Sequence, residues 1–297
     1  MNLPDLHRHL DGSMRRSTLL ELARSAAVTV ASDLRFHAGM GLQAALACFE
    51  ATLSTLQHPP AVERVASEIC DDARTENVTT LEIRFAPQLH RGADLGSIID
   101  AAVSGAAGRA GIILCALYDD PPELVENLVT LGKARKGVVA LDLAGGPAPS
   151  HRYGMREYAR AFTMARDAGM GRTVHAGEGR PPDEIRVAIE HLHAQRIGHG
   201  TTLLQDERVV DLVRERNVTI EACPTSNVHT GVIQNVSEHP IAQWLQLGIR
   251  ACINTDNTLL SDVTAPQEHE RTLRADGMDQ ELLERCVAHG HAAAFRR

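Results

Sequence analysis

Two histidines stand two positions apart near the start of the chain. His7 and His9 belong to a short stretch closed by Gly12, a pattern typical of a strand that ends in a turn. Side chains two residues apart on a strand share a face, so the two imidazoles point the same way and Arg8 points the other way. Two neutral imidazoles that converge from one strand end can hold a divalent metal ion. Such a pair also occurs by chance among ordinary surface or packed histidines.

Matching polar groups follow several later apolar stretches. His175 precedes Glu178 by three residues, and His199 lies between two glycines. Asp256 follows the last predicted strand. Any one of these groups could be structural. Their recurrence at the ends of five predicted strands favours one metal-dependent hydrolytic site built from all of them.

The elements that must position these residues alternate between short apolar strands and amphipathic helices. Eight strand–helix units predict a (β/α)8 TIM barrel, an α/β fold whose active site lies at the carboxyl ends of the strands. The alternative is a doubly wound open sheet, but its first turn often carries a glycine-rich phosphate loop, and residues 9–12 here read His-Leu-Asp-Gly. The predicted strands span 5–9, 79–85, 112–117, 138–142, 172–175, 196–198, 219–222 and 250–254. The helices after them span 97–110, 122–133, 153–168, 183–193, 206–215 and 240–247.

The connection after the first strand is longer than a barrel loop requires. It carries helical patterns at 17–27, 41–56 and 60–76. Because this insertion leaves from the active-site end, its first part is interpreted as a helical lid and its last helix as the first outer helix of the barrel. A purely scaffolding role is equally compatible with the pattern.

Composition narrows the class of protein. The chain has 297 residues, no evident linker and no repeat, which predicts a single domain over 1–297. Its formal net charge of −8 argues against a nucleic-acid or anionic-membrane surface. The six cysteines are scattered without a C-x-x-C pair, which predicts reduced thiols. With no signal-peptide pattern and no apolar run long enough to span a bilayer, we expect a cytoplasmic protein. The sequence does not indicate the oligomeric state.

Seven short motifs occur in one order along nearly the whole chain, and in combination they are highly specific. Through them the chain resembles the adenosine deaminase family of the amidohydrolase superfamily. The motifs are His-Arg-His-Leu-Asp-Gly-Ser (7–13), Glu-Ile-Arg-Phe-Ala-Pro (82–87), Asp-Leu-Ala-Gly (142–145), His-Ala-Gly-Glu (175–178), Arg-Ile-Gly-His-Gly (196–200), Cys-Pro-Thr-Ser-Asn (223–227) and Asn-Thr-Asp-Asn (254–257).

The resemblance implies a catalytic centre that hydrolyses a 6-aminopurine to the 6-oxo product and ammonia. Glu178, His199 and Asp256 would be its catalytic residues: protonated Glu178 would donate to purine N1, and His199 would orient a water and help to take its proton. One zinc ion per chain would lower the pKa of that water towards about 7. The zinc ligands implied are His7, His9, His175 and Asp256.

The substrate-binding residues implied are Asp11, Gly145 and Asn257. Asp11 corresponds to a contact to the sugar 5′ end, and a plain turn aspartate is an equal alternative. The Gly145 N–H can meet the purine edge, although Gly146-Pro147 follows where many relatives have Asp-Glu. Asn257 replaces an aspartate that faces purine N7, and its amide can donate to that acceptor without first being protonated.

Several alternatives remain open. The expected partner is a small-molecule purine, with adenosine the first candidate. Adenine, an aminodeoxyfutalosine-type nucleoside, a modified adenosine, AMP, or a cyclic amide hydrolysed by another amidohydrolase are the others. A second design of zinc deaminase uses thiolate ligands from P-C-x-x-C, but Cys223 precedes a proline and has no partner two residues on. His191 and His193 repeat the His-x-His spacing, yet they end a predicted helix, where cations are favourable anyway.

Overall fold

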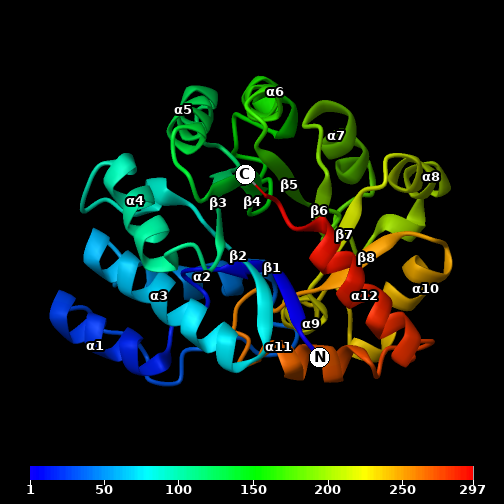
Figure 1. The fold of residues 1–297 in the computed structure, drawn as a ribbon, viewed down its shortest axis with the longest axis horizontal. Helices are drawn as coiled ribbons and strands as arrows, with labels where there is room; N and C mark the ends of the chain where they lie inside the picture. Colours follow the sequence, from blue (N-terminus) through cyan, green and yellow to red (C-terminus); the bar gives the residue numbers. More distant parts are fainter. Residues whose placement is uncertain (297) are drawn as a thin grey trace.

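The strands form one closed parallel barrel. A computed structural model describes residues 1–296, and its eight strands pair in parallel in chain order, as predicted (Figure 1). The strands are β1 (Leu3–His9), β2 (Val78–Phe85), β3 (Gly111–Leu117), β4 (Val138–Ala144), β5 (Gly171–Ala176), β6 (Arg196–His199), β7 (Thr219–Ala222) and β8 (Arg250–Ile253).

Backbone hydrogen bonds just beyond β8 close the barrel onto β1. The N–H of His9 donates to the carbonyl of Asp256 at 2.8 Å, and the N–H of Asp256 donates to the carbonyl of His7 at 2.8 Å. The Leu6 N–H donates to the side-chain oxygen of Asn254, also at 2.8 Å. Three of the four residues predicted to bind metal, His7, His9 and Asp256, therefore lie on the seam where the first and last strands meet.

The helices form an outer ring around the strands (Figure 1). They bury their apolar faces against strands whose two sides are both covered, which is why the strands are almost uniformly apolar apart from isolated charges. The helices are α1 (Arg16–Ala26), α2 (Leu42–Leu53), α3 (Pro59–Thr75), α4 (Leu95–Ala106), α5 (Pro122–Lys133), α6 (Ala159–Asp167), α7 (Asp183–His191), α8 (Glu207–Glu215), α9 (Pro224–His229), α10 (Ile241–Gln246), α11 (Ala265–Thr272) and α12 (Gln280–Ala293).

Some predicted boundaries were wrong for identifiable reasons. The helix predicted over 97–110 ends at Ala106, because Ala107 adopts a left-handed conformation with φ 50°. The helix predicted over 153–168 is a short 3₁₀ turn, Met155–Tyr158, followed by α6. Three helices after β7 were not predicted. The last, α12, begins at an Asp279 side chain that accepts from the Leu282 N–H at 2.8 Å.

The insertion after β1 divides as the sequence suggested. Its last helix, α3, packs against α4 and β2 as part of the outer ring. Its middle helix, α2, extends side chains over the carboxyl end of the barrel. All six cysteines are free, and only Cys48 is partly exposed. Within residues 1–296 no helix is long and apolar enough to cross a bilayer.

Candidate active site

The structure brings the predicted histidines together at the carboxyl end of the barrel. The rings of His7 and His175 have centroids 4.5 Å apart, and those of His7 and His199 are 5.0 Å apart. His9 completes the cluster, with its ring centroid 5.3 Å from that of His175. Gly198 is required here because a Cβ at that position would lie 2.8 Å from His7 Cε1. Residues from three strands thus share one small volume.

Two groups in this cluster could hold a metal ion: the ligand atoms of His7, His9 and Asp256 all lie within 4.8 Å of one another, and so do those of His7, His175 and His199. His9 Nε2 lies 3.3 Å from His175 Nε2 and 3.4 Å from Asp256 Oδ1, and His7 Nε2 lies 3.6 Å from the same oxygen. Two tetrahedral ligands, each about 2.0–2.1 Å from one ion, lie about 3.3–3.4 Å apart. His7 Nε2 is also buried without a hydrogen-bond partner. The donor set therefore fits a zinc-type divalent ion.

Carboxylates behind the cluster fix which ring nitrogens face inward. His7 Nδ1 lies 2.6 Å from Glu221 Oε2, and His175 Nδ1 lies 3.2 Å from Asp142 Oδ1. A ring that donates from Nδ1 leaves the lone pair of Nε2 for a metal. Burial, together with the Arg84 cation, lowers the pKa of His7. Burial alone would lower the pKa of His175, but the Asp142 carboxylate outweighs it and the pKa is raised.

The supporting residues Arg84, Asp142 and Glu221 had no role in the sequence prediction. The Arg84 guanidinium donates to Asp142 at 2.9 Å and to Glu221 at 2.8 Å, so one cation aligns both carboxylates. All three side chains are fully buried. The available signal was a charged residue in the interior of each of three apolar strands, which an ordinary core would not accept without a partner.

Glu178 and His199 face each other beside the donor cluster. Glu178 Oε2 lies 3.8 Å from His199 Nε2, and the Thr230 hydroxyl donates to Glu178 Oε1 at 3.2 Å. Burial raises the pKa of Glu178 and lowers the pKa of His199 to about 3. Burial thus shifts both groups towards their uncharged forms. Asn227, also unassigned from sequence, holds the far side of His199, with its amide nitrogen 3.1 Å from Nδ1.

Two of these residues hold an uncommon backbone conformation. His199 has φ 67° and Asp256 has φ 61°, in the left-handed region that side chains other than glycine seldom adopt. Such strain persists where the surrounding structure holds it, and it concentrates at functional sites. Each of the two residues turns its side chain back over the barrel mouth at the end of its strand.

A narrow cavity of about 70 Å³ opens above the cluster. The predicted Gly145 and Asn257 line it, but Asp11 does not. Asp11 is buried nearby, with Oδ1 unpartnered, and burial raises its pKa to about 7. The insertion supplies the apolar cover of the cavity, through Phe36, Leu42, Ala45, Leu46 and Phe49.

Asn257 is seated against the turn that follows β1. A Cβ at Gly12 would lie 1.9 Å from Asn257 Oδ1, so only glycine leaves room for that amide. The Asn257 side chain therefore lies between this turn and the cavity, which it also lines. This placement agrees with the donor role expected of Asn257 but does not test it.

Comparisons with known proteins agree with this geometry. The family model described as adenosine deaminase matches residues 3–296. A protein named adenosine deaminase from Vibrio atlanticus is 36% identical, with 98% of this chain and 92% of the relative covered. A zinc-bound amidohydrolase from Burkholderia ambifaria superposes with a TM-score of 0.90 at 22% identity, covering 100% of this chain and 86% of the other. The N6-methyl-AMP deaminase of Arabidopsis thaliana superposes with a TM-score of 0.86 at 25% identity, covering 100% and 93%.

Proposed function

This chain belongs to the adenosine deaminase family, and from that premise we propose that it hydrolyses the 6-amino group of a purine nucleoside, with adenosine the first candidate. The products would be the 6-oxo purine and ammonia. The observation that carries the proposal is buried Glu178, 3.8 Å from His199 Nε2 and with a raised pKa, at the edge of the cluster of donor atoms.

We assign the metal to His7, His9, His175 and Asp256, and zinc fits this donor set best. When bound, such an ion lowers the pKa of a water and so supplies a nucleophile at neutral pH. Glu221 and Asp142 hold two of the ligating rings in the orientation that exposes Nε2. The residues that carry protons are a separate pair.

Glu178 acts as the general acid in this proposal. Because burial raises its pKa, its carboxyl keeps a proton that it can donate to purine N1, which makes C6 electrophilic. His199 stays neutral, since burial lowers its pKa, and its Nε2 accepts a proton from the attacking water. The Gly145 N–H and the Asn257 amide orient the ring, at the purine edge and at N7 respectively. The apolar side chains of α2 exclude bulk water from the reacting atoms.

The charge of the cavity favours a nucleoside over a nucleotide. Among the described residues that line it, none is lysine or arginine, whereas Glu178 and Asp256 are acidic. A phosphate group would meet carboxylates without a cation to pair with it. AMP and phosphorylated derivatives are therefore the least favoured of the alternatives, while adenine and neutral modified nucleosides remain compatible with the lining.

A substrate panel tests the proposal. Adenosine, 2′-deoxyadenosine, adenine and AMP would each be incubated with the protein, and loss of the 6-aminopurine absorbance would be followed together with ammonia release. We expect the highest kcat/KM for a nucleoside and the lowest for AMP. Hydrolysis of a cyclic amide with no deamination of any 6-aminopurine would overturn the proposal in favour of another amidohydrolase activity.

A further inference from the structure

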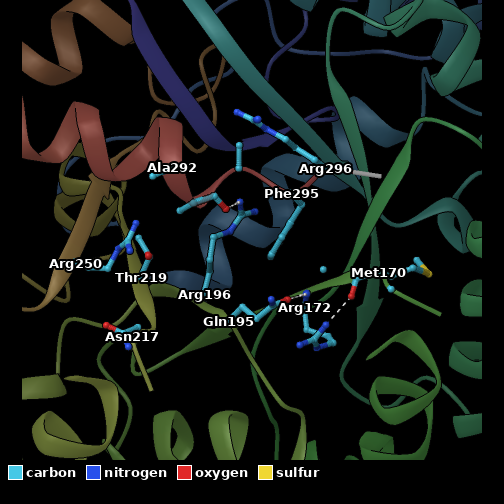
Figure 2. A pocket seen from close by; sticks show the side chains of 14 residues that line it. Met170, Arg172, Gln195, Arg196, Asn217, Thr219, Arg250, Ala292, Phe295 and Arg296 are labelled. Carbon is cyan, nitrogen blue, oxygen red and sulfur yellow. Dashed lines mark hydrogen bonds between the residues drawn. The ribbon is translucent and has the colours of Figure 1, made fainter. Parts of the chain in front are cut away.

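The C-terminal segment, residues 294–296, covers the end of the barrel opposite the active site (Figure 1). It follows α12, which packs under β1 and β8 so closely that a Cβ at Gly290 would lie 2.4 Å from Pro4 Cγ. From there residues 294–296 run towards the middle of the amino end of the barrel. A cavity of about 460 Å³ lies beside it, lined by Arg172, Arg196, Arg250 and Phe295 among others (Figure 2).

The segment is held by specific polar contacts. The Phe295 N–H donates to Glu82 Oε1 at 2.6 Å, and Arg196 donates to the carbonyl of Ala293 at 3.1 Å. The Phe295 ring faces the Arg196 guanidinium, with 3.7 Å between Cζ and the ring centroid (Figure 2). The ring also fills the space beside Gly171, where a Cβ would lie 2.3 Å from it. The segment is therefore built into the floor of the barrel.

A row of buried charges connects this floor to the metal ligand His7. Arg196 pairs with Glu82 and, through Nε at 2.6 Å, with Glu221 Oε1. The other oxygen of Glu221 lies 2.6 Å from His7 Nδ1. Glu82, Arg196 and Glu221 are each no more than 2% exposed, so little water screens the contacts between them.

We propose that the C-terminal segment is a positioning element of the metal site, acting on His7 through Glu82, Arg196 and Glu221. The ring of Phe295 shields Arg196 from water. Without that cover, solvent would compete for the guanidinium and weaken its hold on Glu221, which would then orient the His7 imidazole less firmly. The inference goes beyond the proposed activity, but it rests on the proposed role of His7 as a ligand.

Phe295→Ala tests the proposal through metal binding. The metal-free protein would be titrated with Zn²⁺ against a competing chelator, and the absorption spectrum of its Co²⁺ form would report ligand geometry. We expect Phe295→Ala to raise the metal Kd about 10-fold, at the low end for losing a partner behind a ligand, and to alter the cobalt bands. Phe295→Tyr keeps an aromatic face over Arg196 and should restore both readouts. Phe295→Leu keeps an apolar cover if the alanine variant does not fold, and should give an intermediate Kd.

Thr80→Val is the matched control. It removes the contact of 2.7 Å between Thr80 Oγ1 and His291 Nδ1, which holds α12 to β2, but it does not touch the row of charges. It should lower Tm and leave the metal Kd and the cobalt spectrum unchanged. If Phe295→Ala behaves as this control does, the segment only stabilises the fold and the inference is wrong. If the wild-type protein binds no metal at all, the proposed site and this inference both fail.

Discussion

The two ends of the barrel both bury charged side chains, but they differ in whether the buried polar atoms have partners. At the carboxyl end, polar atoms are buried without partners: His7 Nε2, Asp11 Oδ1 and Asn257 Oδ1. At the amino end the carboxylates are paired. Glu82 has Arg196 and the Phe295 N–H, and Glu221 receives two guanidinium groups and the hydroxyl of Thr173 at 2.9 Å.

This difference separates scaffold from function. A buried polar atom without a partner costs about 1–3 kcal/mol, so a group of them around one cavity marks a candidate ligand site, although Arg196 Nε and Arg250 Nε at the amino end also lack a hydrogen bond. The amino end, where the carboxylates are paired, contributes rigidity. The carboxyl end, called the unpaired end below, has polar atoms available to a ligand. Substitutions at the carboxyl end should therefore affect metal content and turnover, and those at the amino end should act through stability or through His7.

The largest effect is expected from His175→Ala. Elemental analysis of the wild-type protein should give about one zinc-type ion per chain. The variant should lose that ion and more than ~100-fold in kcat/KM together, because a ligand matters more than the groups behind it. His191→Ala, in the second His-x-His pair, is the control and should change neither quantity. A metal-free wild-type protein with full activity would remove the basis for calling the unpaired end a metal site.

Glu178→Gln should separate chemistry from binding at the same end. The amide cannot donate an acidic proton, so kcat should fall at least ~10²-fold while metal content and purine binding are retained. Because protonated Glu178 is the active form, wild-type kcat/KM should decline as pH rises through its raised pKa, and that limb should be absent from the variant. Near-normal kcat in the variant would show that Glu178 is not the acid.

Asn257→Ala should have a smaller, substrate-dependent effect. If the amide donates to purine N7, its loss leaves that acceptor unpaired at a cost of about 1–3 kcal/mol in kcat/KM. A 7-deaza-6-aminopurine nucleoside has no such acceptor, so the variant should lose most of the wild-type preference for the natural purine. The kcat/KM values of both proteins on both substrates form a double-mutant-style cycle. If the substitution and the loss of N7 show no coupling, Asn257 does not contact N7.

The smallest effect on catalysis is expected from the N-caps of two outer helices, which contact neither the metal-binding cluster nor the row of charges behind it. Asp279→Ala removes the N-cap of α12 and should lower the free energy of unfolding by about 1 kcal/mol without changing kcat/KM. Asp94→Ala removes the equivalent cap of α4 and should cost about the same. Chemical denaturation gives both values. A clear loss of turnover from either variant would mean that these caps do more than stabilise their helices.

The sequence predicts the carboxyl end of the barrel better than the amino end. The sequence predicted that the histidines and carboxylates of the carboxyl end lie together, because a barrel places the carboxyl ends of all its strands on one rim. Short motifs at separate strand ends could therefore be combined into one site. The paired end was missed because its partners, such as Glu82 and Phe295, are 213 residues apart and Phe295 belongs to none of the seven motifs. The helices after β7 were missed because short helices gain their stability from tertiary packing that periodicity does not record.

The seam between β1 and β8 has a consequence for how the enzyme is made. It joins backbone positions as far as 249 residues apart, His7 and Asp256, so it can form only late in synthesis and folding. With the ligands proposed above, a nascent chain would until then offer an ion only His7 and His9, and His175 and Asp256 would arrive later. Tight capture of the ion therefore waits for a chain able to use it, which limits how long a half-made protein could hold the wrong metal.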